Sequence, residues 1–457
     1  MHIHIIGIAG TMTAHLAVSL KKQGHTITGS DQEKIYPPIS TTLKKAQIKI
    51  NSINIDKSID LAIIGSSYNS FEKTKEEFEQ IKKLEIPFIS ATEYIAQNLV
   101  KENSILVAGS FGKTTITSLI SWIFLKAKKN PNYMIGGNPK NKFDSIHFSP
   151  SDWSITEADE SIHGLDAMAK FLYYPVKYLV LTSADWEHKD CYSTELDNFN
   201  AFKELILRVP KDGVILINNQ NEIAKKLALY ANSKVITYNS SDANYFIEKT
   251  QIKNNLTTLL IHTPTGLIKI DTKLIGNFNF ENILAAVAIS DYLEIKSHFI
   301  QNAIFSFSGI KRRLELIGNY KGILFFDDFA QSNDRVKSAL EAIKLHFPEH
   351  DIKVLYQPHA SFIQYKDSLK NFSSAFNLAS EVVVSQIGYK KEINKDQRTT
   401  AKDFQNQIGN KLHYLPIEKD IINYYQQNLK SKDILINMSS GGKSGNRIIK
   451  NIVKNFK

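Results

Sequence analysis

The stretch ILVAGSFGKTTITSLI, residues 105–120, decides the fold. A short apolar run ends in a glycine turn, and an apolar, helix-like pattern follows it. A strand, a glycine turn, Lys-Thr and a helix together hold phosphate, because small residues let backbone N–H groups approach the oxygens and the helix N-terminus adds partial positive charge. We therefore expect Lys113 to reach the outer phosphates and the Thr114 hydroxyl to bind Mg²⁺.

The turn is a shortened phosphate loop of the form G-x-x-G-K-T-T, with Val107 where the usual spacing places a glycine. An incidental turn is the alternative for such a variant. The apolar strand before it and the segment TSLISWIFLKA after it favour a nucleotide site.

The composition is that of a globular protein of two or three domains, since the chain has 457 residues with 42% hydrophobic and 22% charged residues. No apolar run approaches the ~20 residues that span a bilayer. The segment MHIHIIGIAG lacks the pattern of a signal peptide. A single cysteine, Cys191, fits a reducing compartment. We expect a cytoplasmic protein without a membrane partner.

The net charge of +10 raises the question of a nucleic-acid partner. The lysines are scattered along the chain, and no dense basic block or aromatic-interleaved stripe is present. We therefore expect no nucleic-acid partner, and we assign the basic balance to general composition and anionic small substrates. The expected assembly is a monomer or a weak homo-oligomer.

Strands alternate with helices along the whole chain, which predicts an α/β fold with mostly parallel sheets. The predicted strands lie in three blocks. The first block contains HIHIIGIA, HTITGSD and DLAIIGSS; the second contains SILVAGS, WSITEAD, VKYLVLTSAD and GVILINNQN; the third contains GILFFDDFA, IKVLYQPHA, SEVVVSQI and DILINMSS. This pattern predicts three consecutive domains: a Rossmann-like domain at 1–99, a P-loop-like ATPase domain at 100–311 and a Rossmann-like domain at 312–457.

A first glycine cluster also joins a strand to a helix. Gly7 and Gly10 lie in this turn. Ser30 and Asp31 end the next predicted strand, where their side chains could contact the ribose or base of a nucleotide. A plain strand-to-helix turn is the alternative, because the cluster is not a complete G-x-G-x-x-G.

Acidic residues follow two strands of the second block. ITEADES places Glu157, Asp159 and Glu160 at a strand end, and LTSADWEHKD places Asp185, Glu187, His188 and Asp190 after the next predicted strand. Carboxylates and an imidazole near a Lys-Thr loop could hold Mg²⁺ and position a second substrate. Loops of solvated acids are the alternative.

Five motifs, the last made of two segments, follow one another along the chain in the order of the Mur ligases and resemble theirs; these are ATP-dependent enzymes that form amide bonds in peptidoglycan synthesis. GSFGKTT resembles their ATP loop, EADES their Mg²⁺-binding carboxylate motif and TSADWEHKD their acid–histidine motif. GNFNFENILAA (276–286) resembles the helix whose asparagines meet adenine. RRLEL (312–316) and FFDDFA (325–330) resemble the Arg and Asp elements that open the C-terminal domain.

The resemblance implies a role for individual residues. The implied catalytic residues are Lys113, His188 and Arg313. The implied ATP-binding residues are Gly109, Ser110, Gly112, Lys113, Thr114, Thr115, Asn279, Asn282, Arg313 and Asp328. The implied Mg²⁺ ligands are Thr114, Glu157 and His188. The implied UDP-sugar-binding residues are Gly7, Gly10, Ser30, Asp31 and Ser66.

Within the family, MHIHIIGIAGTMTAHLA and YPPIST (36–41) most resemble the murein peptide ligases of peptidoglycan recycling. These join UDP-N-acetylmuramate to an L-alanyl-γ-D-glutamyl-meso-diaminopimelate tripeptide. The resemblance implies that ATP phosphorylates the lactyl carboxylate and that the peptide amine attacks the resulting acyl phosphate. Addition of free L-alanine is the alternative within the family. A module that binds nucleotide or UDP-sugar without forming a bond is the alternative of another class.

The sequence also departs from the family pattern. Phe111 and Phe278 stand where histidines are usual, and Gln331-Ser332-Asn333 stands where His-His-Pro is usual. These positions lie beside the nucleotide or the incoming amine in the family. By the same resemblance, the loops at 357–362 and 439–445 face the incoming peptide.

Overall fold

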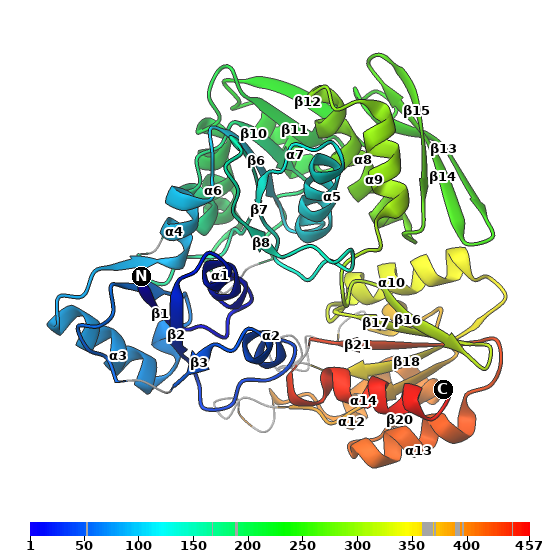
Figure 1. Ribbon diagram of the computed structural model, residues 1–457. Coiled ribbons are helices and arrows are strands. Elements are labelled where there is room, and N and C mark those ends of the chain that lie inside the picture. Colours follow the sequence, from blue (N-terminus) through cyan, green and yellow to red (C-terminus); the bar gives the residue numbers. More distant parts are fainter. Residues whose placement is uncertain are drawn as a thin grey trace. The chain divides into compact units, whose positions relative to one another are not determined.

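The computed structural model describes the chain apart from residues 52–53, 167, 188–190, 359–368, 370–371, 389–393, 395–396 and 441. The chain forms two compact units. The first contains residues 1–273 and 279–308, and the second contains residues 274–278 and 309–457. Both units alternate strands and helices (Figure 1), and the elements counted below are those of the described residues. The domain boundaries predicted at residues 99 and 311 stay predictions.

The first sheet of the first unit is parallel throughout, with five strands in the order β3-β2-β1-β4-β5. Its strands are β1 (His2–Ile6), β2 (Thr26–Ser30), β3 (Lys49–Ile50), β4 (Leu61–Ile64) and β5 (Phe88–Ser90). Its helices are α1 (Thr11–Lys22), α2 (Ile39–Lys45), α3 (Glu72–Lys83) and α4 (Ala91–Asn98), with the 3₁₀ helix η1 (Tyr68–Ser70). Ile5 packs in the core cluster that contains Leu16 of α1, whereas Ile6 packs in the cluster that contains Phe78 of α3. Successive strand residues point to opposite faces, so helices cover both faces of this sheet.

The second sheet of the first unit has seven strands in the order β12-β11-β10-β6-β9-β7-β8, and only the β7–β8 pair is antiparallel. Its strands are β6 (Asn103–Ala108), β7 (Asn132–Met134), β8 (Ile146–His147), β9 (Trp153–Ala158), β10 (Tyr178–Leu181), β11 (Val214–Asn218) and β12 (Lys234–Tyr238). Its helices are α5 (Lys113–Lys126), α6 (Glu195–Leu207), α7 (Glu222–Ala228), α8 (Asn277–Tyr292) and α9 (Ser297–Ser306), with the 3₁₀ helix η2 (Lys170–Tyr173). The central strands β6 and β10 are almost wholly apolar and buried, as parallel strands covered on both faces must be.

A small antiparallel sheet completes the first unit and was not predicted from the sequence. Its strands are β13 (Phe246–Lys253), β14 (Leu256–Thr263) and β15 (Gly266–Thr272). β14 shows an alternating burial pattern, which is typical of a sheet with one buried face.

The second unit contains a six-stranded sheet in the order β16-β17-β21-β18-β19-β20, and only the edge pair β16–β17 is antiparallel. Its strands are β16 (Glu315–Tyr320), β17 (Ile323–Asp328), β18 (Asp351–Gln357), β19 (Glu381–Val384), β20 (Leu412–Tyr414) and β21 (Asp433–Ser439). Its helices are α10 (Asn333–His346), α11 (Phe372–Ala375), α12 (Ala401–Ile408), α13 (Glu418–Asn428) and α14 (Gly442–Lys454), with the 3₁₀ helix η5 (Gly409–Lys411). Two core clusters, one with α10 and the other with α13 and α14, cover its two faces.

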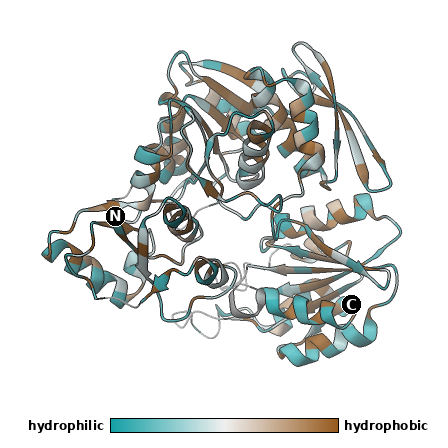
Figure 2. Cartoon of the chain, in the orientation of Figure 1, coloured by the Kyte–Doolittle hydropathy of each residue, from teal (hydrophilic) through white to brown (hydrophobic). Residues whose placement is uncertain are grey.

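The predicted α/β fold with mostly parallel sheets is confirmed. Every apolar run assigned to a strand in the sequence is a strand in the structure. Figure 2 shows many hydrophobic residues on the strands and hydrophilic residues on the outer sides of the helices.

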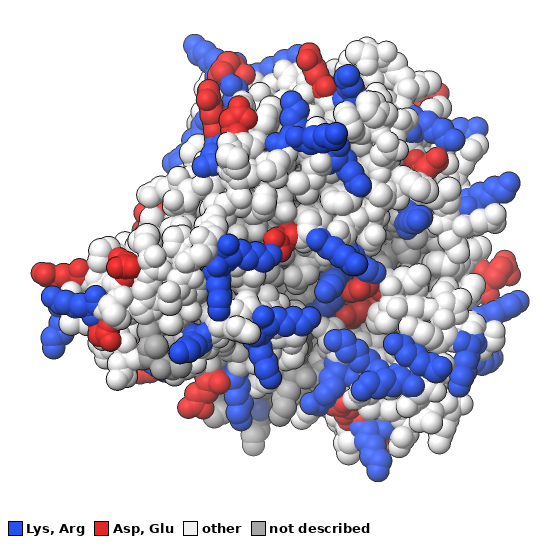
Figure 3. Space-filling model, in the orientation of Figure 1, with Lys and Arg blue, Asp and Glu red and all other residues white. Residues whose placement is uncertain are grey.

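Charged side chains are scattered over the face of the molecule that Figure 3 shows. Figure 3 shows Lys and Arg side chains spread over one face, with several over α14, where Arg447, Lys450 and Lys454 are exposed. Arg447 is paired with Glu418 of α13. Among the described residues, no helix is long and apolar enough to cross a membrane.

The chain has three tryptophans, and all belong to the first unit. Trp122 stacks on Phe143 with ring centroids 5.3 Å apart. Trp153 stacks on Tyr178 at 5.9 Å. The indole N–H of Trp186 donates to a backbone carbonyl at 2.9 Å. Each indole is therefore fixed by its surroundings in this unit.

Candidate active site

Two glycines give the loop between β6 and α5 its shape. Gly109 has φ +128° and Gly112 has φ +80°, a region that side chains disfavour. A Cβ atom at Gly109 would lie 2.2 Å from Oγ1 of Thr182, and one at Gly112 would lie 2.4 Å from Oδ1 of Asn282. The backbone therefore approaches its neighbours closely at both positions, as a phosphate-holding loop requires.

Lys113, the first residue of α5, is held over this loop. Its Nζ lies 2.6 Å from Oε2 of Glu160 and donates to the Gly109 carbonyl at 2.5 Å. Glu160 is only 2% exposed. The ammonium is thus fixed beside the loop, where it could exchange the carboxylate for a phosphate. Sequence reasoning gave Glu160 no role of its own, although it lies three residues after Glu157 in the same motif.

Thr114 and Glu157 meet beside the loop. The Thr114 hydroxyl donates to Oε1 of Glu157 at 3.0 Å, and the Gly136 N–H donates to Oε2 at 2.7 Å. A Cβ at Gly136 would lie 2.6 Å from Oε1 of Glu157, so a side chain at this position would displace the carboxylate.

A hydroxyl and a carboxylate are hard oxygen donors, which suit Mg²⁺. Within the described part of the chain, no group of three or more His, Cys, Asp or Glu side chains is arranged to hold a metal ion. The pair formed by Thr114 and Glu157 therefore fits an ion that takes its other ligands from water and phosphate. His188, the third predicted ligand, lies outside the described residues.

The other predicted ATP residues of the first unit surround the loop. Asn279 and Asn282 are buried on α8, and the Asn282 amide donates to Oδ1 of Asn279 at 3.4 Å. The Ser110 hydroxyl donates to the Asp185 carbonyl at 2.8 Å, which anchors the loop to the segment after β10. Thr115 is half-buried in the first turn of α5. The structure therefore brings α8 and the loop together.

The predicted UDP-sugar residues meet at one edge of the first sheet. The N–H of Gly7, which has φ +74°, donates to the Ser30 carbonyl at 2.8 Å. The Asp31 carboxylate accepts from Ala9 N–H at 2.8 Å, so this side chain shapes the turn. The buried Ser30 hydroxyl has no hydrogen-bond partner among the described residues. Gly10 precedes α1, and Ser66 follows β4 on the same edge.

Arg313 and Asp328 belong to the second unit. Arg313 is exposed, and its guanidinium lies 5.6 Å from the centre of the Phe329 ring. The Asp328 carboxylate accepts from the N–H groups of Leu314 (2.5 Å) and Ala330 (2.7 Å), and burial raises its pKa. Asp328 therefore holds the segment that carries Arg313.

Arg312, which sequence reasoning left unassigned, is buried beside Arg313. Its Nε lies 3.3 Å from Oδ2 of Asp327, and its Nη2 donates to the Ser439 hydroxyl at 2.8 Å. The Asn437 amide donates to Oδ1 of Asp327 at 2.7 Å. Burial raises the pKa of Asp327 to about 6, although Arg312 opposes the shift.

The two loops expected to face the amine donor are described only in part. Residues 359–362 and 441 lie outside the described residues. At the described strand ends, the Gln357 amide donates to Oδ1 of Asn437 at 2.6 Å, which joins β18 to β21.

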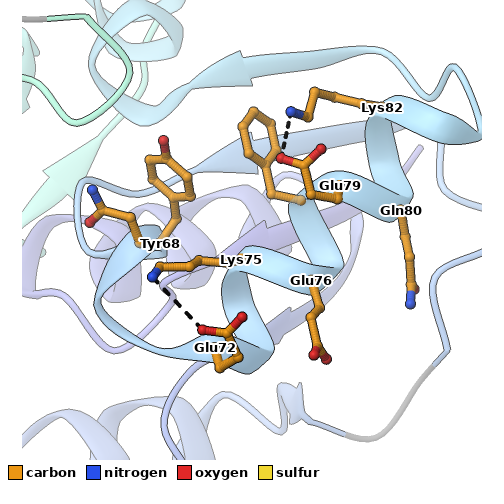
Figure 4. A pocket seen from close by; sticks show the side chains of 9 residues that line it. Tyr68, Glu72, Lys75, Glu76, Glu79, Gln80 and Lys82 are labelled. Carbon is orange, nitrogen blue, oxygen red and sulfur yellow. Dashed lines mark ion pairs between the residues drawn. The ribbon is translucent and has the colours of Figure 1, made fainter.

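A shallow pocket of about 650 Å³ lies along α3 and η1 (Figure 4). Its charged side chains pair along the helix, with Glu72 and Lys75 3.8 Å apart and Glu79 and Lys82 2.6 Å apart. None of the predicted site residues lines it. We assign no part of the candidate active site to this pocket.

Comparisons with known proteins agree along the chain. The model of the Mur ligase family catalytic domain matches residues 2–102, that of the Mur ligase middle domain matches 107–290, and that of the Mur ligase glutamate ligase domain matches 312–441. The phosphate loop, Glu157 and α8 all lie within the middle-domain match.

Two relatives and one solved structure are similar to the chain. A UDP-N-acetylmuramate–L-alanine ligase of Desulfitobacterium hafniense (strain Y51) is 28% identical over 451 residues, which cover 96% of this chain and 97% of the relative. An Escherichia coli (strain K12) enzyme, UDP-N-acetylmuramate–L-alanyl-γ-D-glutamyl-meso-2,6-diaminoheptandioate ligase, is 30% identical over 351 residues, which cover 75% of this chain and 76% of the relative. The crystal structure of a Thermotoga maritima UDP-N-acetylmuramate–alanine ligase has a TM-score of 0.81 at 20% identity, and the match covers 100% of this chain and 98% of that chain.

The described residues form three mostly parallel sheets and one small antiparallel sheet, and the three family models that match them are all of ligase domains. The chain belongs to the Mur ligase family. It is an ATP-dependent enzyme that forms amide bonds in peptidoglycan synthesis.

Proposed function

We propose that the chain joins L-alanine to the lactyl carboxylate of UDP-N-acetylmuramate and converts ATP to ADP and phosphate. The observation that carries the reaction class is the start of α5, where Lys113 pairs with Glu160 and the adjacent Thr114 donates to Glu157. The choice of amine rests on relatives that match 96% of this chain and are named for L-alanine. The sequence had favoured a tripeptide donor, with L-alanine as the alternative.

The chemistry requires an activated carboxylate, because a carboxylate repels an amine's electron pair and oxide is a poor leaving group. A lactyl carboxylate oxygen attacks the γ-phosphorus of ATP, and ADP leaves. The amine nitrogen then attacks the acyl carbon, phosphate leaves with the bonding electrons, and the nitrogen loses a proton. The departing phosphate takes up this proton, so that atoms and charge balance and the products are ADP, phosphate and an amide.

The protein's own residues align the reactants and neutralise charge, because phosphoryl transfer leaves little covalent work for side chains. Lys113 would exchange Glu160 for the β- and γ-phosphate oxygens. Thr114 and Glu157, with His188, would hold Mg²⁺, which supplies charge neutralisation at the transferring phosphoryl group. Asn279 and Asn282 would approach adenine.

The remaining assignments follow the predicted domains. Residues 1–99 would bind the UDP-sugar through the turn at Gly7 and Gly10 with Ser30, Asp31 and Ser66, and the unpaired Ser30 hydroxyl supports a polar ligand there. Residues 100–311 would bind ATP, and residues 312–457 would bind the amine donor. Arg313, which is exposed, would contact phosphate.

The second candidate donor is the tripeptide L-alanyl-γ-D-glutamyl-meso-diaminopimelate. It is favoured by the Escherichia coli relative named for that peptide, which is 30% identical over 75% of this chain. Both donors present an L-alanyl α-amine to the same acyl carbon. Selectivity between the two donors therefore depends on whether the amine-binding region has space and charged groups for the two residues that follow L-alanine in the tripeptide.

The test is phosphate release by the intact chain with ATP, Mg²⁺ and UDP-N-acetylmuramate against a panel of amines. We expect L-alanine to give the highest kcat/KM, and a higher value for the tripeptide would overturn the choice of donor. Lys113→Ala should abolish UDP-N-acetylmuramate-dependent ADP release. Turnover within about tenfold of the unaltered chain would contradict the role of Lys113. Nucleotide binding without amine-dependent ADP formation would favour a binding module.

A further inference from the structure

Helix α1 is joined to the segment that follows β7 through a buried histidine. His15 lies on α1 and is 8% exposed. Its Nδ1 lies 2.7 Å from the Thr11 carbonyl oxygen, and its Nε2 lies 2.8 Å from Oδ1 of Asn138. A carbonyl oxygen can only accept, so Nδ1 of His15 carries the proton and donates to it. In a neutral ring Nε2 is then an acceptor, and rotating the Asn138 amide by 180° puts its NH₂ group at the position of Oδ1, from which it donates to Nε2. Both ring nitrogens are therefore engaged.

The two ends of this contact lead to two different candidate binding sites. Thr11 directly follows Gly10 in the turn proposed to hold the UDP-sugar. Asn138 lies two residues after Gly136, whose N–H donates to Glu157 at 2.7 Å. Glu157 in turn accepts from Thr114. All of these residues belong to the first compact unit.

The segment that carries Asn138 is itself held in place. The Ser145 hydroxyl donates to the Gly137 carbonyl at 2.7 Å, and the Ile135 N–H donates to the Ser145 carbonyl at 2.8 Å. A rigid segment transmits position better than a loose one, because its atoms cannot shift independently. Displacing Asn138 would therefore displace Gly136 and the oxygen of Glu157 that it contacts.

The proposed reaction depends on the distance between these two sites. The lactyl carboxylate must stand about 3–3.5 Å from the γ-phosphorus in line with the leaving oxygen, and a 1 Å misplacement can cost roughly 100-fold in rate. One substrate would be held by the first sheet and the other by the second, so contacts between the two sheets set that distance.

We propose that His15 and Asn138 form a positioning pair that fixes the turn at Gly7–Gly10 relative to Glu157 and the phosphate loop. This inference rests on the proposed function, because it assigns the pair to the alignment of the UDP-sugar carboxylate with ATP. Neither side chain is required to touch a substrate. The pair acts through α1 on one side and through Gly136 on the other.

The chain supplies a matched control on the same two segments. Lys22 of α1 and Asp144 form an ion pair at 2.6 Å, with side chains 57% and 47% exposed. An exposed pair of this kind contributes about 0–1 kcal/mol to stability, because water and salt screen it. Lys22→Ala therefore removes a contact between the same elements without altering the buried hydrogen bond.

The experiment compares His15→Ala, Asn138→Ala, the double variant and Lys22→Ala in the intact chain. We expect kcat to fall about 10- to 100-fold in the first three, with KM for ATP and UDP-N-acetylmuramate within about threefold. The double variant should be no slower than the slower single variant, because both break one contact. Lys22→Ala should keep kcat within about twofold. His15→Gln should recover part of the loss, since its amide can still bridge Thr11 and Asn138.

Three outcomes would overturn the proposed pair. The kcat of His15→Ala could equal that of Lys22→Ala, or the His15 and Asn138 variants could change in KM alone. The third outcome is a loss of kcat in the double variant equal to the product of the losses in the two single variants. A second readout does not depend on turnover. UDP-N-acetylmuramate alone should lower deuterium uptake in residues 136–147 of the unaltered chain and not of His15→Ala, and equal protection would also overturn the pair. An unaltered chain without UDP-N-acetylmuramate-dependent ADP release would contradict the proposed function instead.

Discussion

The ammonium nitrogen of Lys113 lies 2.6 Å from a carboxylate oxygen of Glu160, which is almost completely buried. A triphosphate that binds the loop must compete with this carboxylate for the lysine. The pair keeps the buried ammonium neutralised without nucleotide, because an unpaired charge at such a site is costly. We therefore expect Glu160 to oppose nucleotide binding while it orients the lysine.

Replacing Glu160 with Gln should strengthen the binding of metal-free ATP. The change removes the negative competitor while the amide keeps a similar shape and can still accept a hydrogen bond. We expect the Kd for ATP in the presence of EDTA to fall about three- to tenfold, measured by isothermal titration calorimetry. Asp212→Asn, at an exposed acid paired with Lys177, changes the net charge equally and should leave Kd unaltered. Weaker binding by Glu160→Gln would contradict the competition.

Replacing Glu157 with Gln should raise the Mg²⁺ concentration needed for activity. The carboxylate beside Thr114 is the charged oxygen donor of the proposed metal site, and an amide oxygen is a weaker ligand for a hard cation. We expect the Mg²⁺ concentration at half-maximal ADP release to increase about 10- to 100-fold. Glu222→Gln, at an exposed acid on α7, provides the control. An unchanged Mg²⁺ requirement would place the metal elsewhere.

Replacing Gly112 with Ala should disable the phosphate loop for a steric reason. Its Cβ would lie 2.4 Å from Oδ1 of Asn282, and the residue also has φ +80°. Gly24 has a similar φ of +92° but nothing within 4 Å of its Cβ position. We expect Gly24→Ala to cost about 1 kcal/mol of stability with normal activity, and Gly112→Ala to lose at least about tenfold in kcat/KM for ATP. Equal activities of the two variants would contradict the steric requirement for a glycine at position 112.

Asp327 should make the stability of the second unit dependent on pH. Burial raises its pKa from 3.8 to about 6. An acid with a raised pKa binds its proton preferentially in the folded state, so the free energy of unfolding falls as pH rises through this interval. The unaltered chain should lose about 2 kcal/mol relative to Asp327→Asn between pH 4 and 7. Urea unfolding followed by circular dichroism measures the difference.

The exposed Asp351, at the start of β18, supplies the control for that measurement. Asp351→Asn removes one carboxyl group at an exposed position of the same sheet and should leave the pH profile of the unaltered chain in place. A constant difference between Asp327→Asn and the unaltered chain from pH 4 to 7 would contradict the raised pKa.

The sequence predicted the strands well because buried parallel strands are apolar and end in recognisable turns. β6, β10 and β21 are of this kind. The antiparallel sheet of β13–β15 escaped prediction because β14 and β15 alternate buried residues with less buried ones, and β13 and β15 interrupt their apolar residues with charged ones. The candidate phosphate loop could be recognised because its two glycines and the Lys-Thr pair lie within a few residues of one another, so one short segment contains the whole motif.

Contacts between distant segments were not predictable from one sequence. The approach of Glu160 to Lys113 joins residues 47 positions apart, and the contact of His15 with Asn138 spans 123 positions. A histidine inside a helix carries no local signal for its partner. Likewise, the hydrogen bond from the Ala9 N–H to the Asp31 carboxylate was not predictable, and the expected contact of Asp31 with a ligand stays a prediction. The role of His188 stays a prediction, because that residue lies outside the described part of the chain.

The position of the three indoles gives the molecule a built-in optical reporter. The first unit contains all three tryptophans, Trp122, Trp153 and Trp186. Fluorescence excited at wavelengths that only tryptophan absorbs therefore comes from that unit alone. The second unit is silent in this signal yet contributes to the far-ultraviolet spectrum. Melting curves recorded by the two methods on one sample would therefore separate the unfolding of one unit from that of the other without any label.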